Sequence, residues 1–403
     1  MKQSAPLSRV QYGLYVECAS HQGEPCYNLP YIYVLDGSLD GDRLCQAIVT
    51  AFKSHPTLFT RIELNDAGEP MQTIDLANED FSLSIKEIQD IEQEKRHLIK
   101  PFDIYGDRLF HVSLMRDKEH YYLFVDYHHL IVDGTSMKVL LHDIEKAYNN
   151  EAIEPETITM AQIAVEEVEK RQQPAFEDAK RWYAANFDCG DTFTQLMPDR
   201  YESQHSEASH LHTLKTDMAR VDEFCKANGI FKSNFFTAAF SFLLAKYNNE
   251  QESLFTTVYN GRSDKRMMRT VGMTVKTLPV YGKFTAETTV LDFLRSLQDQ
   301  MSGCREHDIY NYSDLMTDLN LQSNSMFAWH GNLFADERWA GLPMKTVRLC
   351  NSYLDASFYL KAFILGDHYQ AKAEYNSNEY SEELVAQFLE SYEAVVEGFL
   401  SQV

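Results

Sequence analysis

The sequence predicts an α/β (α+β) protein built from two lobes of similar size. Strand-like and helix-like patterns alternate along the chain, and 403 residues are too many for one ordinary hydrophobic core. Hydrophobic residues make up 44% of the composition, including 24 Phe and 23 Tyr, which is ample for two packed cores. Because the chain turns polar or irregular between about 150 and 205, we expect an N-terminal lobe at 1–170, a connecting segment at 171–205 and a C-terminal lobe at 206–403.

The N-terminal lobe is expected to alternate short strands with two amphipathic helices. Leu44, Ile48 and Phe52 recur at helical spacing, and Pro56 ends that helix. Further on, an aromatic and β-branched run favours a pleated, largely buried strand. The expected elements, in chain order, are apolar segments at 11–15 and 31–34, a helix at 41–54, strands at 57–64, 107–116 and 121–127, and a helix at 137–149 capped by Thr135 or Ser136.

The C-terminal lobe repeats this alternation after a connecting segment that holds one helix. Residues 166–174 and 187–200 are polar or irregular and bracket that helix, which we expect at 176–186. Gly229 separates two further helices, and the second of them is apolar on nearly all sides, which indicates a buried helix. The remaining expected elements are helices at 219–228 and 234–247, strands at 253–259 and 273–280, a helix at 288–303, strands at 343–362 and 367–375, and a helix at 382–401.

The most informative segment is a His-His-x-x-x-Asp-Gly element at residues 128–134. It lies where the strand over 121–127 ends and the helix over 137–149 begins. A neutral imidazole accepts a proton near pH 7, so an exposed histidine at this position suits general-base chemistry. Because adjacent strand residues point to opposite faces, His128 and His129 cannot both take part. The favoured interpretation is a reactive His129.

This element has two other interpretations. A pair of histidines near a carboxylate can bind a metal ion, but no third ligand at metal spacing follows, so no metal is expected. A purely structural strand end with a tight Asp-Gly turn is the more serious alternative.

Charge and cysteine usage exclude several classes of partner. A net charge of −23 argues against binding to nucleic acid and to anionic membrane surfaces. No apolar stretch has the length of a membrane span, and the first residues lack the apolar core of a signal peptide. The cysteines show no Cys-x-x-Cys pair, which favours buried thiols in a reducing, cytoplasmic setting. The seven cysteines are at 18, 26, 45, 189, 225, 304 and 350.

Several segments, in order along essentially the whole chain, resemble the condensation domain of nonribosomal peptide synthetases. That family is related in fold to chloramphenicol acetyltransferase. The resemblance implies two such lobes arranged as a V-shaped pseudo-dimer within one monomeric chain. Besides 128–134, the segments that carry it are Leu7–Tyr15, His55–Leu58, Asn260–Arg262, Val271–Pro279, Arg305–Tyr310 and Glu374–Asn376.

The chain also departs from the family pattern. Family members usually have Asn where Lys276 stands and Arg where Phe59 stands, and an Arg-rich motif near 320–330 is missing. These differences bear on substrate contacts and supporting ion pairs more than on the fold.

The resemblance implies a reaction between two thioesters. Donor and acceptor carrier proteins each deliver a substrate on a phosphopantetheine arm, with adenylation domains as expected neighbours. The acceptor amine attacks the donor carbonyl, and the domain itself binds no cofactor. His129 would deprotonate or orient the amine, and the N–H of Gly134 would donate to the oxyanion from a helix N-terminus.

Other site residues follow from the same resemblance. Asp133 is expected to pair with Arg262 and hold the turn rather than act as a catalytic acid, because a buried carboxylate is tolerated only when it is paired. His128 is expected to pack beneath the active site. Further candidates for substrate contacts are Ser136, Asn260, Lys276 and His307.

Alternative functions remain open from the sequence. Epimerising relatives carry a glutamate and a second histidine in the region of 258–262, and this chain has no carboxylate there. Heterocyclising relatives replace the histidines with aspartates. An ester-forming acyltransferase and a non-catalytic domain that recruits carrier proteins are the remaining alternatives. The sequence does not identify donor or acceptor, nor whether the chain is free-standing or one domain of a synthetase.

Overall fold

The computed structural model describes residues 3–21, 23–25, 27–74, 80–106, 108–190, 192–201, 206–332, 337–349 and 357–402. The chain divides into two compact units that differ from the contiguous lobes expected above. Unit 1 comprises Met1–Gln172, Asn260–Val275 and Asp336–Tyr353. Unit 2 comprises Gln173–Tyr259, Lys276–Ala335 and Leu354–Val403.

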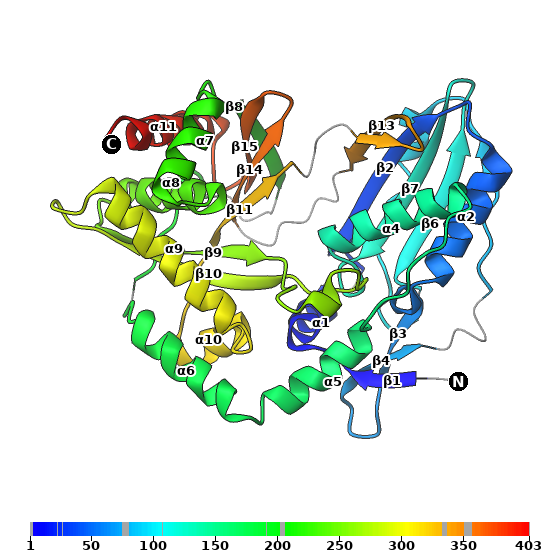
Figure 1. Cartoon of the computed structure of the whole chain (residues 1–403), viewed down its shortest axis with the longest axis horizontal. Helices are drawn as coiled ribbons and strands as arrows, with labels where there is room; N and C mark the ends of the chain where they lie inside the picture. Colours follow the sequence, from blue (N-terminus) through cyan, green and yellow to red (C-terminus); the bar gives the residue numbers. More distant parts are fainter. Residues whose placement is uncertain are drawn as a thin grey trace. The chain divides into compact units, whose positions relative to one another are not determined.

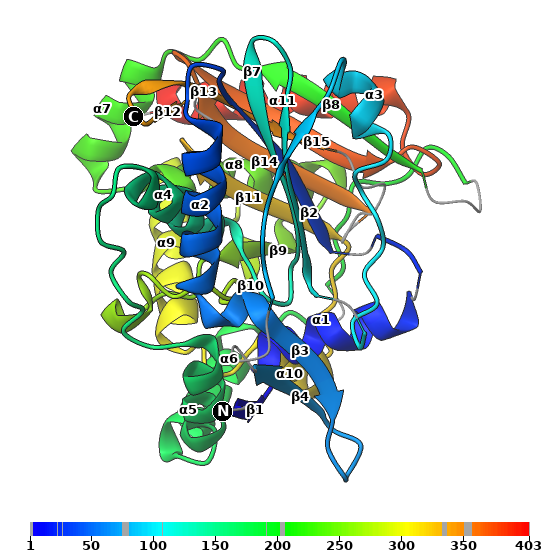
Figure 2. The same ribbon diagram turned by 90° about the vertical axis from the view of Figure 1, so that its right-hand side faces the viewer.

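Unit 1 is built on a six-stranded sheet with the strand order β12-β13-β2-β7-β6-β5. The pairs β2–β7, β6–β7 and β13–β2 are antiparallel, and the short β5 runs parallel to β6. Figure 1 and Figure 2 show helices α2 and α4 beside this sheet. These elements are β2 (Asn28–Asp36), α2 (Gly41–Lys53), β5 (Ile85–Glu87), β6 (Phe110–Arg116), β7 (His120–His128), α4 (Gly134–Tyr148), β12 (Glu337–Trp339) and β13 (Leu342–Arg348).

The two faces of this sheet differ, because side chains alternate along each strand. On β7, Leu123 and Val125 belong to the main core of the unit together with Leu44 of α2 and Leu140 of α4. Their neighbours on the other face, including Phe124, form a smaller apolar cluster. His128, the last residue of β7, lies on that second face.

Unit 1 also contains a small three-stranded sheet, β1-β4-β3, and several shorter elements. A capping box of Thr159 and Gln162 starts α5, and one of Ser8 and Gln11 starts α1. The elements are β1 (Gln3–Pro6), α1 (Arg9–Ser20), the 3₁₀ helix Pro56–Phe59, β3 (Thr60–Leu64), β4 (Pro70–Ile74), α3 (Ile91–Lys95), α5 (Met160–Lys170) and the 3₁₀ helix Lys265–Met267.

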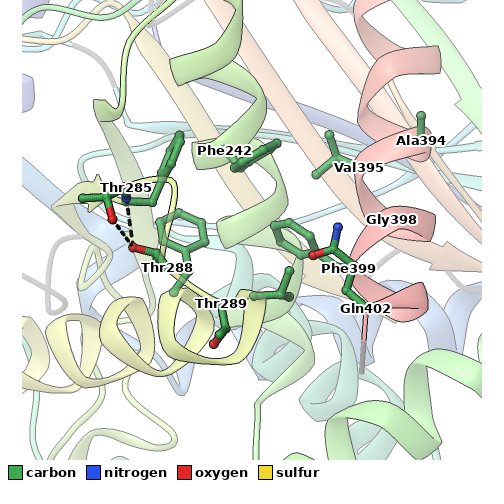
Figure 3. A pocket seen from close by; sticks show the side chains of 12 residues that line it. Phe242, Thr285, Thr288, Thr289, Ala394, Val395, Gly398, Phe399 and Gln402 are labelled. Carbon is green, nitrogen blue, oxygen red and sulfur yellow. Dashed lines mark hydrogen bonds between the residues drawn. The ribbon is translucent and has the colours of Figure 1, made fainter.

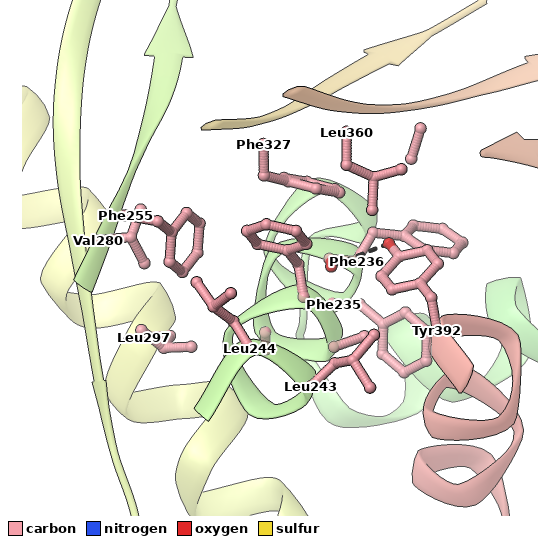
Figure 4. Close-up of a cluster of buried hydrophobic side chains, with 14 of the residues drawn as sticks. Phe235, Phe236, Leu243, Leu244, Phe255, Val280, Leu297, Phe327, Leu360 and Tyr392 are labelled. Carbon is pink, nitrogen blue, oxygen red and sulfur yellow. Dashed lines mark hydrogen bonds between the residues drawn. The ribbon is translucent and has the colours of Figure 1, made fainter. Parts of the chain in front are cut away.

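Unit 2 has its own six-stranded sheet, with the strand order β10-β9-β11-β14-β15-β8. Helix α8 lies in the core of unit 2. It is buried on nearly all sides, as its largely apolar sequence predicted. Figure 4 shows Phe235, Phe236 and Leu244 of α8 in the buried cluster. The elements are α6 (Pro174–Asn186), β8 (Glu207–Thr213), α7 (Met218–Asn228), α8 (Lys232–Tyr247), β9 (Glu252–Tyr259), β10 (Lys276–Lys283), α9 (Val290–Glu306), α10 (Tyr312–Leu319), β11 (Ser325–Gly331), β14 (Phe358–Leu365), β15 (His368–Asn376) and α11 (Glu382–Ser401).

Three expected elements are wrong. The single strand predicted at 343–362 is two strands: β13 pairs with β2 in unit 1, and β14 pairs with β11 and β15 in unit 2. The polar stretch at 166–174 is largely the end of α5, because its capping box starts a helix at Met160 that continues through the charged residues to Lys170. The strand predicted at 57–64 begins only at Thr60, because Pro56 opens a 3₁₀ turn.

Predictions for the other elements and for the cysteines agree better with the structure. Most remaining helices and strands lie within a few residues of their expected bounds, and Gly229 ends α7 with a φ of 68°. The five described cysteines are all buried, and no disulfide joins any two of them. Cys26, Cys350, Asp107 and residues 202–205 of the connecting segment lie outside the described residues.

Candidate active site

The His-His-x-x-x-Asp-Gly element lies between the end of β7 and the start of α4, entirely in unit 1. Its first histidine is packed on all sides. His128 is 2% exposed, its Nδ1 accepts a hydrogen bond from the N–H of Leu130 at 3.1 Å, and its Nε2 lies 3.5 Å from Sγ of Cys18. The ring of Phe102 meets it edge to face, with 5.8 Å between centroids. Burial and the neighbouring His129 lower the pKa of His128 to about 3, so this ring is a neutral part of the packing.

The second histidine has a different environment. His129 is half-buried, its backbone N–H donates to the carbonyl of Tyr27 at 2.9 Å, and the two rings meet edge to face. Within the described residues, its Nδ1 has no hydrogen-bond partner. Burial lowers the pKa of His129, although the nearby Asp133 carboxylate opposes this shift. The imidazole is therefore neutral at neutral pH, which is the form that can accept a proton.

Asp133 is the N-cap of α4, a place that the sequence analysis had assigned to Thr135 or Ser136. Its Oδ1 accepts hydrogen bonds from the backbone N–H and the hydroxyl of Ser136, both at 2.8 Å. Its Oδ2 accepts from the backbone N–H and the hydroxyl of Thr274, at 3.1 and 2.8 Å. Six hydrogen bonds, two of them from Arg262, satisfy a carboxylate that is fully buried.

Arg262 completes this arrangement as a two-pronged donor. Its Nη1 and Nη2 lie 2.8 and 2.9 Å from Oδ2 and Oδ1 of Asp133, and neither side chain is exposed. Burial alone would raise the pKa of Asp133, but the charge and hydrogen bonds of Arg262 outweigh it and hold that pKa below its ordinary value. The Asp133–Arg262 pair predicted from the sequence is present. Both residues lie in unit 1, because Asn260–Val275 belongs to that unit and not to a contiguous C-terminal lobe at 206–403.

The loop that carries Arg262 depends on a glycine. Gly261 has a φ of 68°, and a Cβ at this position would lie 1.7 Å from the carbonyl oxygen of Thr274. The hydroxyl oxygen of Thr274 lies 2.9 Å from the carbonyl oxygen of Asn260, so its one hydrogen is shared between that carbonyl and Asp133. Only a residue without a side chain permits the two segments to approach closely enough to present Arg262 to Asp133.

Gly134 is a glycine for a different reason. It is the exposed first residue of α4, and a Cβ built on it would meet nothing within 4 Å. Neither backbone conformation nor internal packing therefore requires glycine there. Its N–H is the first of the helix and lies at the positive end of the helix dipole, in an exposed residue.

The other predicted substrate contacts differ in exposure: Ser136 is buried and Asn260 is exposed. Ser136 is fully buried, and its hydroxyl contacts Asp133, Arg262 and Gly272. It was predicted to contact substrate, but in the structure it holds neighbouring segments together. Asn260 is exposed, with its Oδ1 accepting from the N–H of Arg262.

Lys276 and His307 belong to unit 2. The ammonium of Lys276 is held by the side chain and the carbonyl of Asp308, at 3.0 and 2.9 Å. His307 ends α9 and stacks on Trp182 with 4.7 Å between ring centroids. Both side chains have internal partners that account for their positions.

Sequence reasoning missed two contributors to this site. Thr274 supplies two of the hydrogen bonds to Asp133, and Thr270 accepts one from Arg262 through its carbonyl. A pairing signal was missing for both, because hydroxyl and backbone contacts over such sequence separations leave no periodic pattern.

The segment His55–Leu58, which resembled a family motif, contributes a separate buried cluster. Nδ1 of His55 lies 2.6 Å from Glu156 and its Nε2 lies 2.8 Å from Asp143. Arg269, from the same segment as Arg262, binds the other side of Asp143 at 2.8 Å. Burial alone would lower the pKa of His55, but the two carboxylates outweigh it and raise that pKa. This cluster is a second anchor for Asn260–Val275.

Comparisons with known proteins agree with this architecture. The fold is that of chloramphenicol-acetyltransferase-like proteins. A solved structure with this fold is the first condensation domain of the calcium-dependent antibiotic synthetase, in complex with a substrate analogue. It superposes with a TM-score of 0.81 at 15% identity, covering 99% of this chain and 96% of that one. The family model described as Condensation domain matches residues 1–403. The chain therefore belongs to the condensation-domain family.

Relatives by sequence are much larger proteins. Tyrocidine synthase 3 of Brevibacillus parabrevis is 26% identical over 327 residues, which are 79% of this chain but 5% of that protein. The fold itself does not separate activities within the family. The epimerization domain from the third module of tyrocidine synthetase B is as similar in structure, with a TM-score of 0.81 at 16% identity, covering 100% of this chain and 98% of that one.

None of the helices in the described part of the chain is both long and apolar enough to cross a membrane. No group of three or more His, Cys, Asp or Glu side chains within it is arranged to hold a metal ion.

Proposed function

We propose that this domain forms an amide bond between a donor acyl or peptidyl thioester and the amine of an acceptor aminoacyl thioester. In this proposal both substrates arrive on the phosphopantetheine arms of carrier proteins. The observation that supports it most is the rigid end of β7 and start of α4. There, the Asp133–Arg262 ion pair fixes the turn on which a neutral His129 and the open N–H of Gly134 are displayed.

In this reaction the main task of the protein is to align the two substrates, because a thioester is already activated. Holding an amine in line with its carbonyl can contribute up to about 7–11 kcal/mol in well-oriented cases. His129 then accepts the proton of the attacking amine or orients its lone pair, which is typically worth about 10²–10⁴-fold. The N–H of Gly134 donates to the oxyanion that forms at the carbonyl carbon.

Epimerisation is the activity that most needs to be distinguished, given the structural similarity to an epimerization domain. Removing and returning an α-proton on opposite faces needs a second acid–base group. Residues 258–262 read Val-Tyr-Asn-Gly-Arg and supply no carboxylate. The sequence at this position therefore favours condensation.

The test uses the whole chain with two loaded carrier proteins in deuterated buffer. Intact-mass analysis of the acceptor carrier should show a dipeptidyl thioester, and the donor residue should retain its α-hydrogen. Deuterium uptake without dipeptide would establish epimerisation instead. An ester product with a hydroxyl acceptor, in place of the amide, would establish the ester-forming alternative.

A recruiting domain without catalysis would give a different result again. Both carriers would bind, for example in a pull-down or by calorimetry, yet neither amide nor deuterated donor would form. The matched control is His129→Ala, which should bind the carriers as the wild type does and form little product.

A further inference from the structure

Unit 2 contains a pocket that plays no part in the proposed reaction. It lies between the later turns of α8, the start of α9 with the turn before it, and the last turns of α11. Figure 3 shows its lining side chains from close by, with Phe242, Val395 and Phe399 among them. Its volume is about 340 Å³, at the lower end of the range for small-molecule sites.

The walls are apolar and largely aromatic. Four phenylalanine rings from three elements line the pocket, and two of them, Phe242 and Phe284, are 5.0 Å apart between centroids. Threonine hydroxyls and the amide of Gln402 are its only polar lining groups among the described residues, and none of these lining side chains is charged. A ligand with an apolar body would fit these walls.

A cation stands beside the aromatic wall. Lys246 follows Phe242 by one turn of α8, and its Nζ lies 5.5 Å from the Phe242 ring centroid and 4.6 Å from that of Phe284. The side chain is exposed, and it has no ion-pair partner within the described parts of the chain. An ammonium beside an apolar pocket is the complement of an anionic head group on an apolar body.

The pocket also reaches the backbone of α11. Gly398 lines it from the interior of that helix, and a Cβ built there would meet nothing within 4 Å. Glycine weakens a helix interior relative to alanine, and neither a positive φ nor a close approach requires it at this position. The glycine therefore keeps space open where a side chain would fill the pocket.

We propose that this pocket binds a small carboxylic acid with an apolar body, such as a medium-chain alkanoate. The body lies among the phenylalanine rings and the carboxylate pairs with the ammonium of Lys246. This site is separate from the His129 turn and does not depend on the proposed condensation activity.

The test measures binding of octanoate and its uncharged analogue octanamide to the full chain by calorimetry. Octanoate should bind saturably at one site and more tightly than octanamide. Lys246→Gln should weaken octanoate by about twofold to fivefold, as expected for a solvent-exposed ion pair, and leave octanamide unchanged. Lys283→Gln is the matched control, because Lys283 also stands over an aromatic ring, but that ring belongs to Tyr281 and does not line the pocket.

Filling the pocket provides the second arm. Gly398→Leu should abolish binding of both probes while the melting temperature stays at or above that of the wild type. If that variant fails to fold, Gly398→Ala, whose added methyl group has free space, should keep the fold and lower the affinity for both probes. Absence of saturable binding to the wild type, equal affinity for acid and amide, or unchanged binding in the folded Gly398 variants would each overturn the proposal.

Discussion

Arg262 and Asp133 are 129 residues apart in sequence and share two hydrogen bonds, of 2.8 and 2.9 Å, in a fully buried ion pair. The same carboxylate caps α4 through Ser136. One aspartate thus fixes the start of the helix that follows the histidines and ties the segment Asn260–Val275 to it. These contacts hold the end of the turn between His129 and Gly134 from two sides.

Breaking this pair from either side should destabilise unit 1. Arg262→Ala or Asp133→Ala leaves one buried charge without its partner, at a cost of about 3–5 kcal/mol in unfolding free energy. The double variant should cost less than the sum of the single ones, which urea denaturation of all four proteins measures. Strict additivity would contradict the coupling.

Arg266→Ala is the matched control for this cycle. Arg266 comes from the same segment and binds Glu166 and Asp264, but its side chain is exposed. Solvent screens such a pair, so its loss should leave the urea midpoint nearly unchanged.

Substitution by alanine should lower the stability of the protein at Gly261 but not at Gly134. Gly261→Ala forces a methyl group against the carbonyl of Thr274 in a left-handed backbone, so soluble yield and melting temperature should fall. The backbone conformation alone accounts for about 1–3 kcal/mol of this loss. Circular dichroism melts of the purified variant measure the change.

Gly134→Ala should leave the melting temperature intact, because the added methyl group meets nothing. If its N–H stabilises the oxyanion, the methyl group obstructs that approach, and product formation should fall by about 10²-fold or more. Wild-type rates for this variant would remove Gly134 from the proposed mechanism.

The elements that carry the candidate site were predicted well, because they are local in sequence. The histidine pair, the strand before it and the helix after it all lie within thirty residues, and strand alternation separated the roles expected for His128 and His129. The Asp133–Arg262 pair was predicted only through the family resemblance. Its location within unit 1 was not, because no periodicity shows which unit a loop such as Asn260–Val275 joins.

Assignments failed where one pattern fits two structures. A β-rich stretch at 343–362 looks the same whether it is one strand or two, and only the partners, β2 for one part and β15 for the other, distinguish them. The cap of α4 was predicted at Thr135 or Ser136 but lies at Asp133, the residue predicted to pair with Arg262. A carboxylate has two oxygens, and here they serve both the cap and the arginine.

The two histidines should separate activity from stability. His129→Ala removes a ring whose Nδ1 makes no hydrogen bond to the described residues, so the melting temperature should change little while dipeptide formation falls by about 10²–10⁴-fold. His128→Ala leaves the buried N–H of Leu130 without its acceptor, which costs about 1–3 kcal/mol. Mass spectrometry measures dipeptide formation by both variants, and thermal melts measure their stability. A stable His129→Ala variant with wild-type activity would exclude a catalytic role for His129.

The His55 cluster should make stability depend on pH on the alkaline side. Asp143 and Glu156 raise the pKa of the buried imidazole above its unfolded value of about 6.5, so folding favours the protonated ring. This contribution is complete below pH 6.5 and is lost as the pH rises through the raised pKa of the folded state, with a slope of at most about 1.4 kcal/mol per pH unit.

Unfolding free energies from urea titrations between pH 6 and 9 should therefore decline in the wild type and decline less in His55→Gln. His142→Gln, which changes an exposed histidine beside Asp143 in sequence, should keep the wild-type slope. Equal slopes in the wild type and His55→Gln would show that folding does not change the protonation of this ring, and would contradict the prediction.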